Sequence, residues 1–169
     1  ENSNLVFTAD GDHVNIDISD NLLTVSPNAD YFGQVTITVT VSDGENLDTD
    51  SFILNVESVN DAPFVVNLID DIEVDEDADS IDIDLVAVFH DVENGSDLAL
   101  SFSENITPVD ISLEGSILTL DFLDNQSGLG QVNISASDLV SRLSVETTFN
   151  VTVNSVNDVP TANAGSSET

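Results

Sequence analysis

The sequence contains no cysteine, methionine, tryptophan or lysine, and Arg142 is its one basic residue apart from two histidines. Without cysteine, the chain can form neither disulfides nor thiolate zinc sites. With so few basic side chains it cannot neutralise phosphates, so nucleic acid and anionic membranes are poor partners, and we expect no nucleic-acid partner. We see no signal peptide and no apolar run suited to membrane insertion, so we expect an interior piece of a secreted or cell-surface protein.

Acidic residues dominate the charge: 33 Asp and Glu give a net charge of −32. Hydrophobic residues nevertheless make up 40% of the chain, which is enough to form a core. They are mostly Val, Ile and Leu, interleaved with Thr, Ser, Asn and Asp, a composition typical of β-sheets. Because salt bridges cannot neutralise this surface, bound cations or high salt must offset its self-repulsion.

The first 63 residues recur later in the chain. An offset of 95 carries Ser42-Asp43 onto Ser137-Asp138, and after a two-residue insertion an offset of 97 carries VNDAP at 59–63 onto VNDVP at 156–160. We therefore expect three parts: a partial repeat at 1–61, a complete repeat at 62–158, and at 159–169 a linker with the start of a following repeat.

The repeats alternate apolar and polar residues with a period of two. Val35, Ile37 and Val39 alternate with threonines, and turn signals separate the short runs. Alternation of this kind places one face of an antiparallel sheet in a core and the other in water. The fold class is therefore all-β, with tandem Greek-key seven-stranded β-sandwiches.

The second repeat opens with roughly 35 residues that have no counterpart in the first. We expect strands at 64–69 and 81–88 within them, so the first repeat lacks its N-terminal strands and exposes at least one sheet edge. We expect this repeat to be completed by another chain or a neighbouring molecule, or else to remain a partial sandwich.

Carboxylates concentrate where the repeats join. Of the 33 acids, 12 lie between Asp70 and Asp97, including a DED run at 75–77 and a loop that contains Asp91 and Glu93. Groups of hard oxygen ligands suit Ca²⁺, which takes six to eight oxygens, better than Mg²⁺, which demands a stricter octahedron.

These motifs resemble bacterial cadherin-like repeats, including the dystroglycan-type group. The features that carry the resemblance are VNDAP closing a Thr/Val strand, the acidic DED before a strand, and DVE followed by NGSDL. The resemblance implies that Ca²⁺ binds between consecutive repeats and stiffens the linker. One implied site comprises Asn60, Asp61, Asp91, Glu93 and Asp138. The other comprises Glu76, Asn157 and Asp158.

The resemblance implies a calcium-rigidified spacer or adhesion module whose partners are the neighbouring repeats of the same chain. The alternative is a Ca²⁺-dependent polysaccharide-binding or self-associating (homophilic) module. We expect no enzyme and assign no catalytic residue: His13 and His90 suit surface or turn roles, and one tyrosine without tryptophan cannot line a sugar-cleaving cleft.

Overall fold

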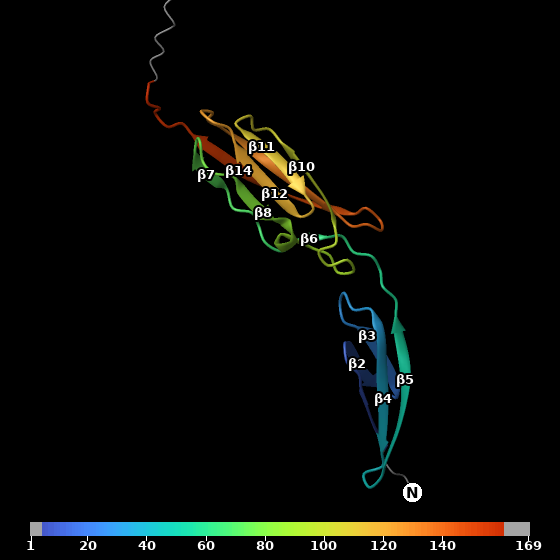
Figure 1. The fold of residues 1–169 in the computed structure, drawn as a ribbon. Helices are drawn as coiled ribbons and strands as arrows, with labels where there is room; N and C mark the ends of the chain where they lie inside the picture. Colours follow the sequence, from blue (N-terminus) through green and yellow to red (C-terminus); the bar gives the residue numbers. More distant parts are fainter. Residues whose placement is uncertain (1–4, 161–169) are drawn as a thin grey trace, which may run out of the picture. The chain divides into compact units, whose positions relative to one another are not determined.

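The computed structural model describes residues 5–160 and divides the chain into two compact units, one ending at Asn60 and one beginning at Asp61. Both units are built of β-strands, which confirms the predicted all-β class (Figure 1). The part expected at 159–169 falls mainly on residues 161–169, which lie outside the described residues.

The second unit is a two-sheet sandwich. Its strands are β6 (Phe64–Val65), β7 (Ile72–Asp75), β8 (Ile81–Asp84), β9 (Phe89–His90), β10 (Ala99–Glu104), β11 (Val109–Glu114), β12 (Ile117–Phe122), β13 (Gly128–Ser137) and β14 (Ser144–Asn154). One sheet has the order β10-β13-β14-β7 and the other β11-β12-β8, while β6 pairs with β9. Strand β7 runs parallel to β14, and the other pairs are antiparallel.

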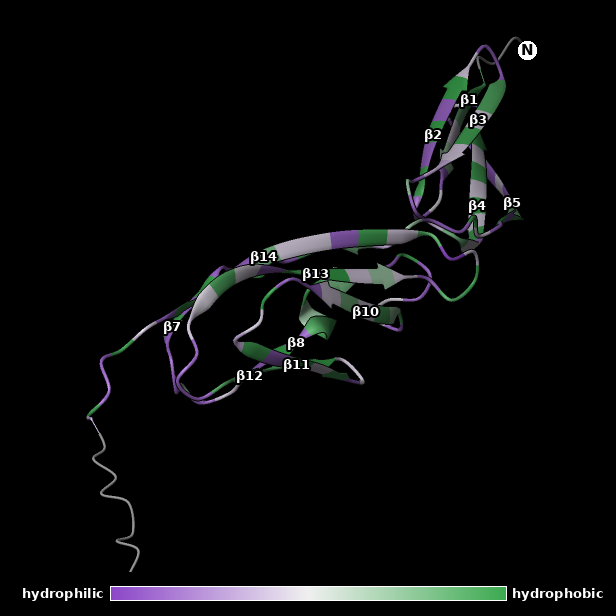
Figure 2. Cartoon of the chain, turned by 90° about the horizontal axis from the view of Figure 1, so that it is seen from above, coloured by the Kyte–Doolittle hydropathy of each residue, from purple (hydrophilic) through white to green (hydrophobic). Residues whose placement is uncertain are grey.

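The core of the second unit is closed on the side where β8 lies. Leu118 of β12 and Ile134 of β13 are fully buried. Leu85, Val88 and Phe89, which follow β8, join the same cluster. Along β14 buried and exposed residues alternate, and Figure 2 shows the matching change of hydropathy from residue to residue. Burial of these apolar faces is the main stabilising contribution.

The segment that precedes β10 departs from the sequence prediction. The strand expected at 64–69 is wrong beyond Val65, and the strand expected at 81–88 ends at Asp84. There the Asp84 carboxylate accepts a hydrogen bond from the Val86 N–H at 3.0 Å and begins a 3-10 turn, η1 (Leu85–Ala87). A side chain that bonds its own backbone two residues on competes with the sheet, and alternation alone does not reveal this.

The first unit contains five strands in two small sheets. They are β1 (Val6–Asp10), β2 (Val14–Ser19), β3 (Leu22–Pro27), β4 (Gly33–Ser42) and β5 (Leu47–Val56). Their orders are β1-β4-β5 and β2-β3, so these strands match β10 to β14 of the second unit. Residues 5–60 hold no counterpart of β6 to β9, and within this unit one edge of β3 and one edge of β5 have no strand partner.

Equivalent residues of the two units differ in burial. Phe149 on β14 is 1% exposed, whereas its counterpart Phe52 on β5 is 45% exposed. Within residues 5–60, Val35 and Ile37 are the fully buried hydrophobic residues. The same sequence pattern therefore closes a core only where β7 and β8 are present.

Substitutions of Phe149 and Phe52 can measure how much more the second unit gains from burying equivalent side chains. We expect Phe149→Ala to destabilise the second unit by about 3–5 kcal/mol, the cost of a large cavity in a closed core. Phe52→Ala should cost the first unit less than half as much, because its ring is already partly in water. Urea unfolding of both variants, followed by amide NMR signals of each unit, tests this; equal losses would contradict the difference in burial.

Candidate metal centre

The loop after β9 is wound around the carboxylate of Asp91. Its Oδ1 accepts hydrogen bonds from the Glu93 N–H at 3.0 Å and the Asn94 N–H at 2.8 Å. Main-chain bonds of 2.8 and 2.9 Å join Asp91 and Gly95 in both directions, and Gly95 has a φ of 63°, a left-handed conformation that glycine adopts without strain. These bonds hold the side chain of Asp91 in the interior.

Two buried oxygens of this loop have no hydrogen-bond partner. They are Oδ2 of Asp91, a residue with 0% of its surface exposed, and Oδ1 of Asn94. Burying an ionised oxygen without a partner costs several kcal/mol, about 1–3 even for a neutral group. A cation or an ordered water is the usual partner of such oxygens. A third oxygen of this kind, Oδ1 of Asn133, belongs to β13 and not to the loop.

The chain that enters the second unit runs beside this loop. Phe64 of β6 is paired with His90 of β9, so the residues before β6 extend past the end of β9. Here the Asp61 N–H donates a hydrogen bond to Glu93 Oε2 at 3.1 Å. Main-chain N–H groups thus link Asp61 to the Glu93 carboxylate and Glu93 to the Asp91 carboxylate. Asn60 directly precedes Asp61 and is the last residue of the first unit.

Asp138 lies at the same end of the unit, because its neighbour Ser137 is paired with Ala99 at the start of β10. It is 1% exposed. Its Oδ1 accepts bonds from three main-chain N–H groups and its Oδ2 from a main-chain N–H and a hydroxyl. The donors are the N–H groups of Val140, Ser141, Arg142 and Leu143 and the hydroxyl of Ser141, at 2.6 to 3.1 Å. Asp138 therefore organises the loop between β13 and β14.

The second predicted group is less enclosed. Glu76 is half-buried after β7; its N–H donates to the Asn154 carbonyl at 2.8 Å, and its Oε1 accepts from the Val156 N–H at 2.7 Å. Asn157 and Asp158 are exposed in the chain that follows, where the Asn157 amide donates to the Asp158 carbonyl at 3.2 Å. Glu76 is thus joined to the segment that carries the other two residues.

The oxygens of the 91–95 loop fit a hard cation. In the part of the chain that the structure describes, no preassembled group of three or more Asp, Glu or His side chains is suited to hold a metal. The unpaired set is instead mixed, a carboxylate oxygen of Asp91 and an amide oxygen of Asn94. Ca²⁺ accepts such mixtures of carboxylate, amide and main-chain oxygens together with water. Sequence reasoning missed Asn94, whose signal was the Asn-Gly pair after DVE.

Two carboxylates outside this loop have lowered pKa values. The pKa of Asp71 is lowered because its carboxylate accepts hydrogen bonds from the Asn150 side-chain amide at 3.0 Å and the Asn150 N–H at 2.7 Å. The pKa of Asp43 is lowered by hydrogen bonds from the N–H groups of Asn46 and Glu45. Hydrogen bonds to the charged form favour ionisation.

Comparisons with known proteins agree on the type of fold. A family model described as a bacterial Ig domain matches residues 1–57. The human desmocollin-1 ectodomain is 17% identical over 92% of this chain and 34% of that one, with a TM-score of 0.50. The protocadherin GammaB4 extracellular domain is 19% identical over 89% of this chain and 27% of that one, with a TM-score of 0.53. The fold is cadherin-like and Ig-like.

The endo-fucoidan hydrolase MfFcnA4, from glycoside hydrolase family 107, is 17% identical over 90% of this chain, with a TM-score of 0.41. The chain spans about a quarter to a third of these three structures, that is 24%, 27% and 34% of their lengths. No curated protein matches the sequence. Within residues 5–160, no helix is long and apolar enough to cross a membrane.

Substitutions of Asp138 and of its counterpart Asp43 test whether the Asp138 carboxylate stabilises the loop between β13 and β14. We expect Asp138→Ala to destabilise the second unit by about 1–3 kcal/mol in the presence of EDTA, because it removes the buried carboxylate that accepts hydrogen bonds from four main-chain N–H groups of the loop. Asp43→Ala removes fewer bonds from an exposed turn and should cost less. Thermal unfolding of both variants measures this, and a neutral Asp138→Ala would contradict the structural role.

The lowered pKa of Asp71 predicts that the stability of the second unit falls at acidic pH. Because its pKa is lower in the folded state, its contribution is fully present above the unfolded pKa of about 3.9 and is lost as the pH falls through the folded pKa. We expect Asp71→Asn to be less stable than the wild type at pH 7 and the difference to shrink below about pH 4. Urea titrations across this range, with Asp79→Asn as the control for the loss of one charge, check the convergence.

Proposed function

We propose that this chain is a calcium-binding extracellular module, part of an array of cadherin-like repeats that Ca²⁺ stiffens into a spacer or adhesive stalk. The observation that carries the proposal is the buried Asp91 carboxylate, whose Oδ2 has no partner while Asn94 Oδ1 beside it in the loop is equally unpaired. A chain with one arginine and no lysine can supply few positive side chains to such an oxygen, so a cation is its natural partner.

In this proposal Asp91 and Asn94 supply the innermost oxygens, and Glu93 and Asp61 bind from the side on which the chain enters the unit. Asp138, whose two oxygens accept N–H and hydroxyl hydrogen bonds, holds the neighbouring loop at the same end and supports the site from behind. Asn60 would add an oxygen from the chain that leads into Asp61. When bound, Ca²⁺ supplies the positive charge that these oxygens lack, and the residues fix the chain before β6 to the loop after β9.

Calcium would therefore restrict the hinge between consecutive repeats. Without it, the carboxylates of the entering chain and of the loop repel each other, and the linker flexes. With it, both segments bind one ion. Glu76 already accepts a hydrogen bond from Val156, so with Asn157 and Asp158 it would act in the same way at the following junction.

The proposal also includes a bacterial origin and an extracellular location for the parent protein. The bacterial Ig model that matches residues 1–57, together with the VNDAP and DVENG motifs, supports a bacterial protein of the dystroglycan-type cadherin-like group. Ig-like and cadherin-like domains are usually extracellular and non-enzymatic, which supports a secreted or surface-bound parent protein. Its partners would be the neighbouring repeats.

Asp91→Asn tests the calcium site. Sites in extracellular modules bind with Kd of about 10⁻⁴–10⁻³ M, so Ca²⁺ at about 100 times the Kd should stabilise the wild type by about 2.7 kcal/mol. The amide keeps the oxygen that accepts the Glu93 and Asn94 N–H groups but removes the anionic Oδ2. We expect the calcium-dependent rise in melting temperature to disappear.

The matched control is Asp82→Asn, which makes the same change at an exposed position of β8 and should leave the rise intact. Calorimetric titration with Ca²⁺ gives the stoichiometry. Unchanged melting of the wild type between EDTA and about 100 mM Ca²⁺, roughly 100 times the upper end of this Kd range, would refute the proposal.

A further inference from the structure

We propose that the outer face of the sheet β10-β13-β14-β7 in the second unit carries a groove that binds a neutral polysaccharide, a ligand whose hydroxyl groups both donate and accept hydrogen bonds. Three features of this face support it: two adjoining hollows, amide side chains that the protein holds in place, and little charge. Calcium has no part in this binding, because the groove lies on the sheet and not in the 91–95 loop.

Two adjoining hollows form the groove. The larger has a volume of about 500 Å³, and its lining includes Asn105, Gln131, Asn150 and Asp71. The smaller, of about 160 Å³, shares Asn105 and Gln131 and adds Asn133. Because the hollows share two residues, they form one continuous groove, and the larger volume lies in the range of roughly 300–1,000 Å³ that is typical of small-molecule sites.

Strand pairing sets the amide side chains in a row across the sheet. Asn105 directly follows β10, and its N–H donates to the Gln131 carbonyl at 3.2 Å. Gln131 of β13 is paired with Asn150 of β14, which lies beside Asp71, the residue before β7. Gln131 and Asn150 are exposed, whereas Val132, the next residue of β13, is fully buried. The row therefore lies on the outer face of the sheet.

Two of these amides are fixed at one end and free at the other. Asn105 Oδ1 accepts from the Gln131 N–H at 2.7 Å, and the amino group of the same side chain has no partner among residues 5–160. The Asn150 amide donates to the Asp71 carboxylate at 3.0 Å, and its Oδ1 is likewise free within these residues. A ligand thus meets polar groups whose orientation is already set, which lowers the entropy lost on binding.

The smaller hollow contains an acceptor that lacks a donor. The Asn133 amide donates to Glu146 Oε2 at 3.1 Å, while its Oδ1 is buried without a hydrogen-bond partner. Gln131 is two residues away on the same face, and its side chain has no hydrogen-bond partner in the described part of the chain. A sugar hydroxyl in this hollow can donate to Asn133 Oδ1 and accept from the Gln131 amide.

Gly130 lets the chain after β10 lie close enough to β13 to hold Asn105. A Cβ at position 130 would lie 2.6 Å from the Cβ of Ile106 and 2.9 Å from Asn105 Oδ1. Any side chain there would displace this segment, because glycine marks a close approach between two backbones. The position of Asn105 is therefore specified by the sequence of β13.

The groove lies along strands that carry little charge. Strand β13 has no ionisable residue and β14 has one acid, Glu146. The other sheet of the unit carries five acids on its strands: Asp82, Asp84, Asp110, Glu114 and Asp121. A neutral ligand can therefore cover this face without taking many carboxylates out of water, which would be costly. An anionic polysaccharide would instead be repelled by the net charge of −32.

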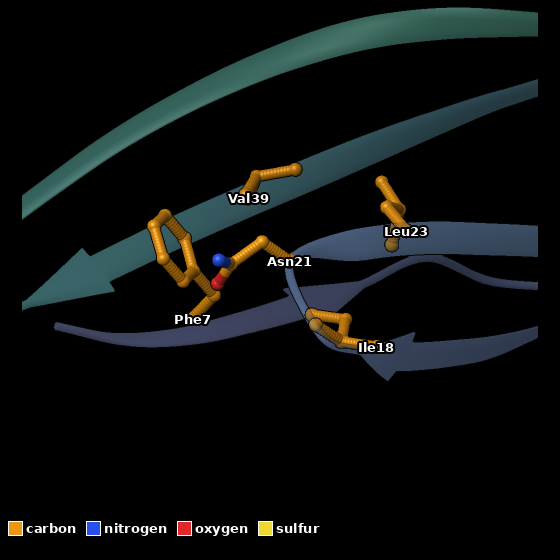
Figure 3. Close-up of a pocket in the computed structure, with 5 residues that line it drawn as sticks. All are labelled: Phe7, Ile18, Asn21, Leu23 and Val39. Atoms are coloured by element: carbon orange, nitrogen blue, oxygen red, sulfur yellow. The ribbon is translucent and has the colours of Figure 1, made fainter.

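The apolar hollow of the first unit has none of these properties. Figure 3 shows Phe7, Ile18, Leu23 and Val39 around it, with Asn21 as the one polar side chain. It belongs to the interior of its own repeat and offers few hydrogen bonds to a hydroxyl group. The polysaccharide site is therefore assigned to the polar groove of the second unit.

The test titrates the full chain, in EDTA, with three neutral oligosaccharides: cellotetraose, maltotetraose and mannotetraose. We expect at least one to bind saturably with a Kd on the order of 1 mM, because the groove offers hydrogen bonds but no aromatic ring. The side-chain amide NMR signals of Asn105, Gln131 and Asn150 should shift with that Kd. Alginate, an anionic polysaccharide, should not bind.

Gln131→Ala removes the free amide from the middle of the groove and should weaken binding about three- to tenfold. The matched control is Gln126→Ala, the same change at an exposed loop position before β13, which should leave binding unchanged. Equal effects of the two variants would overturn the proposal. So would shifts that map elsewhere, alginate binding of similar strength, or no saturable shift up to about 20 mM, roughly 20 times the expected Kd. Binding that requires Ca²⁺ would place the ligand at the 91–95 loop and overturn it as well, whereas failure of the calcium site alone leaves it intact.

Discussion

Main-chain N–H groups are the partners on which the buried acids of this protein depend. With 33 carboxylates and a single arginine, salt bridges can neutralise very few of them. The structure instead winds loops around individual acids: Asp138 accepts four N–H groups and a hydroxyl, and Asp91 accepts two N–H groups through one oxygen. Where a loop satisfies both oxygens, the acid is structural. Where it satisfies only one, as at Asp91, the remaining oxygen defines the candidate cation site.

Strand pairing decides how much of each repeat becomes core. Both units carry the same alternating strands, and both place their aliphatic residues on one face of a sheet. In the second unit β7 and β8 extend the two sheets and the residues after β8 enter between them, so Leu118 and Phe149 are excluded from water. In the first unit those strands have no counterpart among residues 5–60, and Phe52 remains half in solvent. Burial here is set by long-range pairing and not by local sequence.

Much of this architecture follows from the sequence, because period-two alternation and the duplicated pattern are strong signals. They predict the all-β class and the strands shared by the two units. They do not predict β7 or η1, because β7 is a short strand in an acidic stretch and η1 depends on a side chain that bonds its own backbone. The acids at 61, 91, 93 and 138 could be chosen from sequence, and main-chain hydrogen bonds link Asp61 to Glu93 and Glu93 to Asp91. The burial of Asp91 and the unpaired amide oxygen of Asn94 arise only from the folded loop.

The parallel pairing of β7 with β14 has a mechanical consequence for a repeat in an array. The chain enters this unit through β6, continues into β7 and leaves just after β14, and β7 and β14 run in the same direction. Tension along the array would therefore pull these neighbouring strands past each other and load their ladder in shear. All rungs of such a ladder share the force and must break together, whereas a hairpin pulled open from one end breaks rung by rung. The short β7 would thus act as a clamp on a repeat under load.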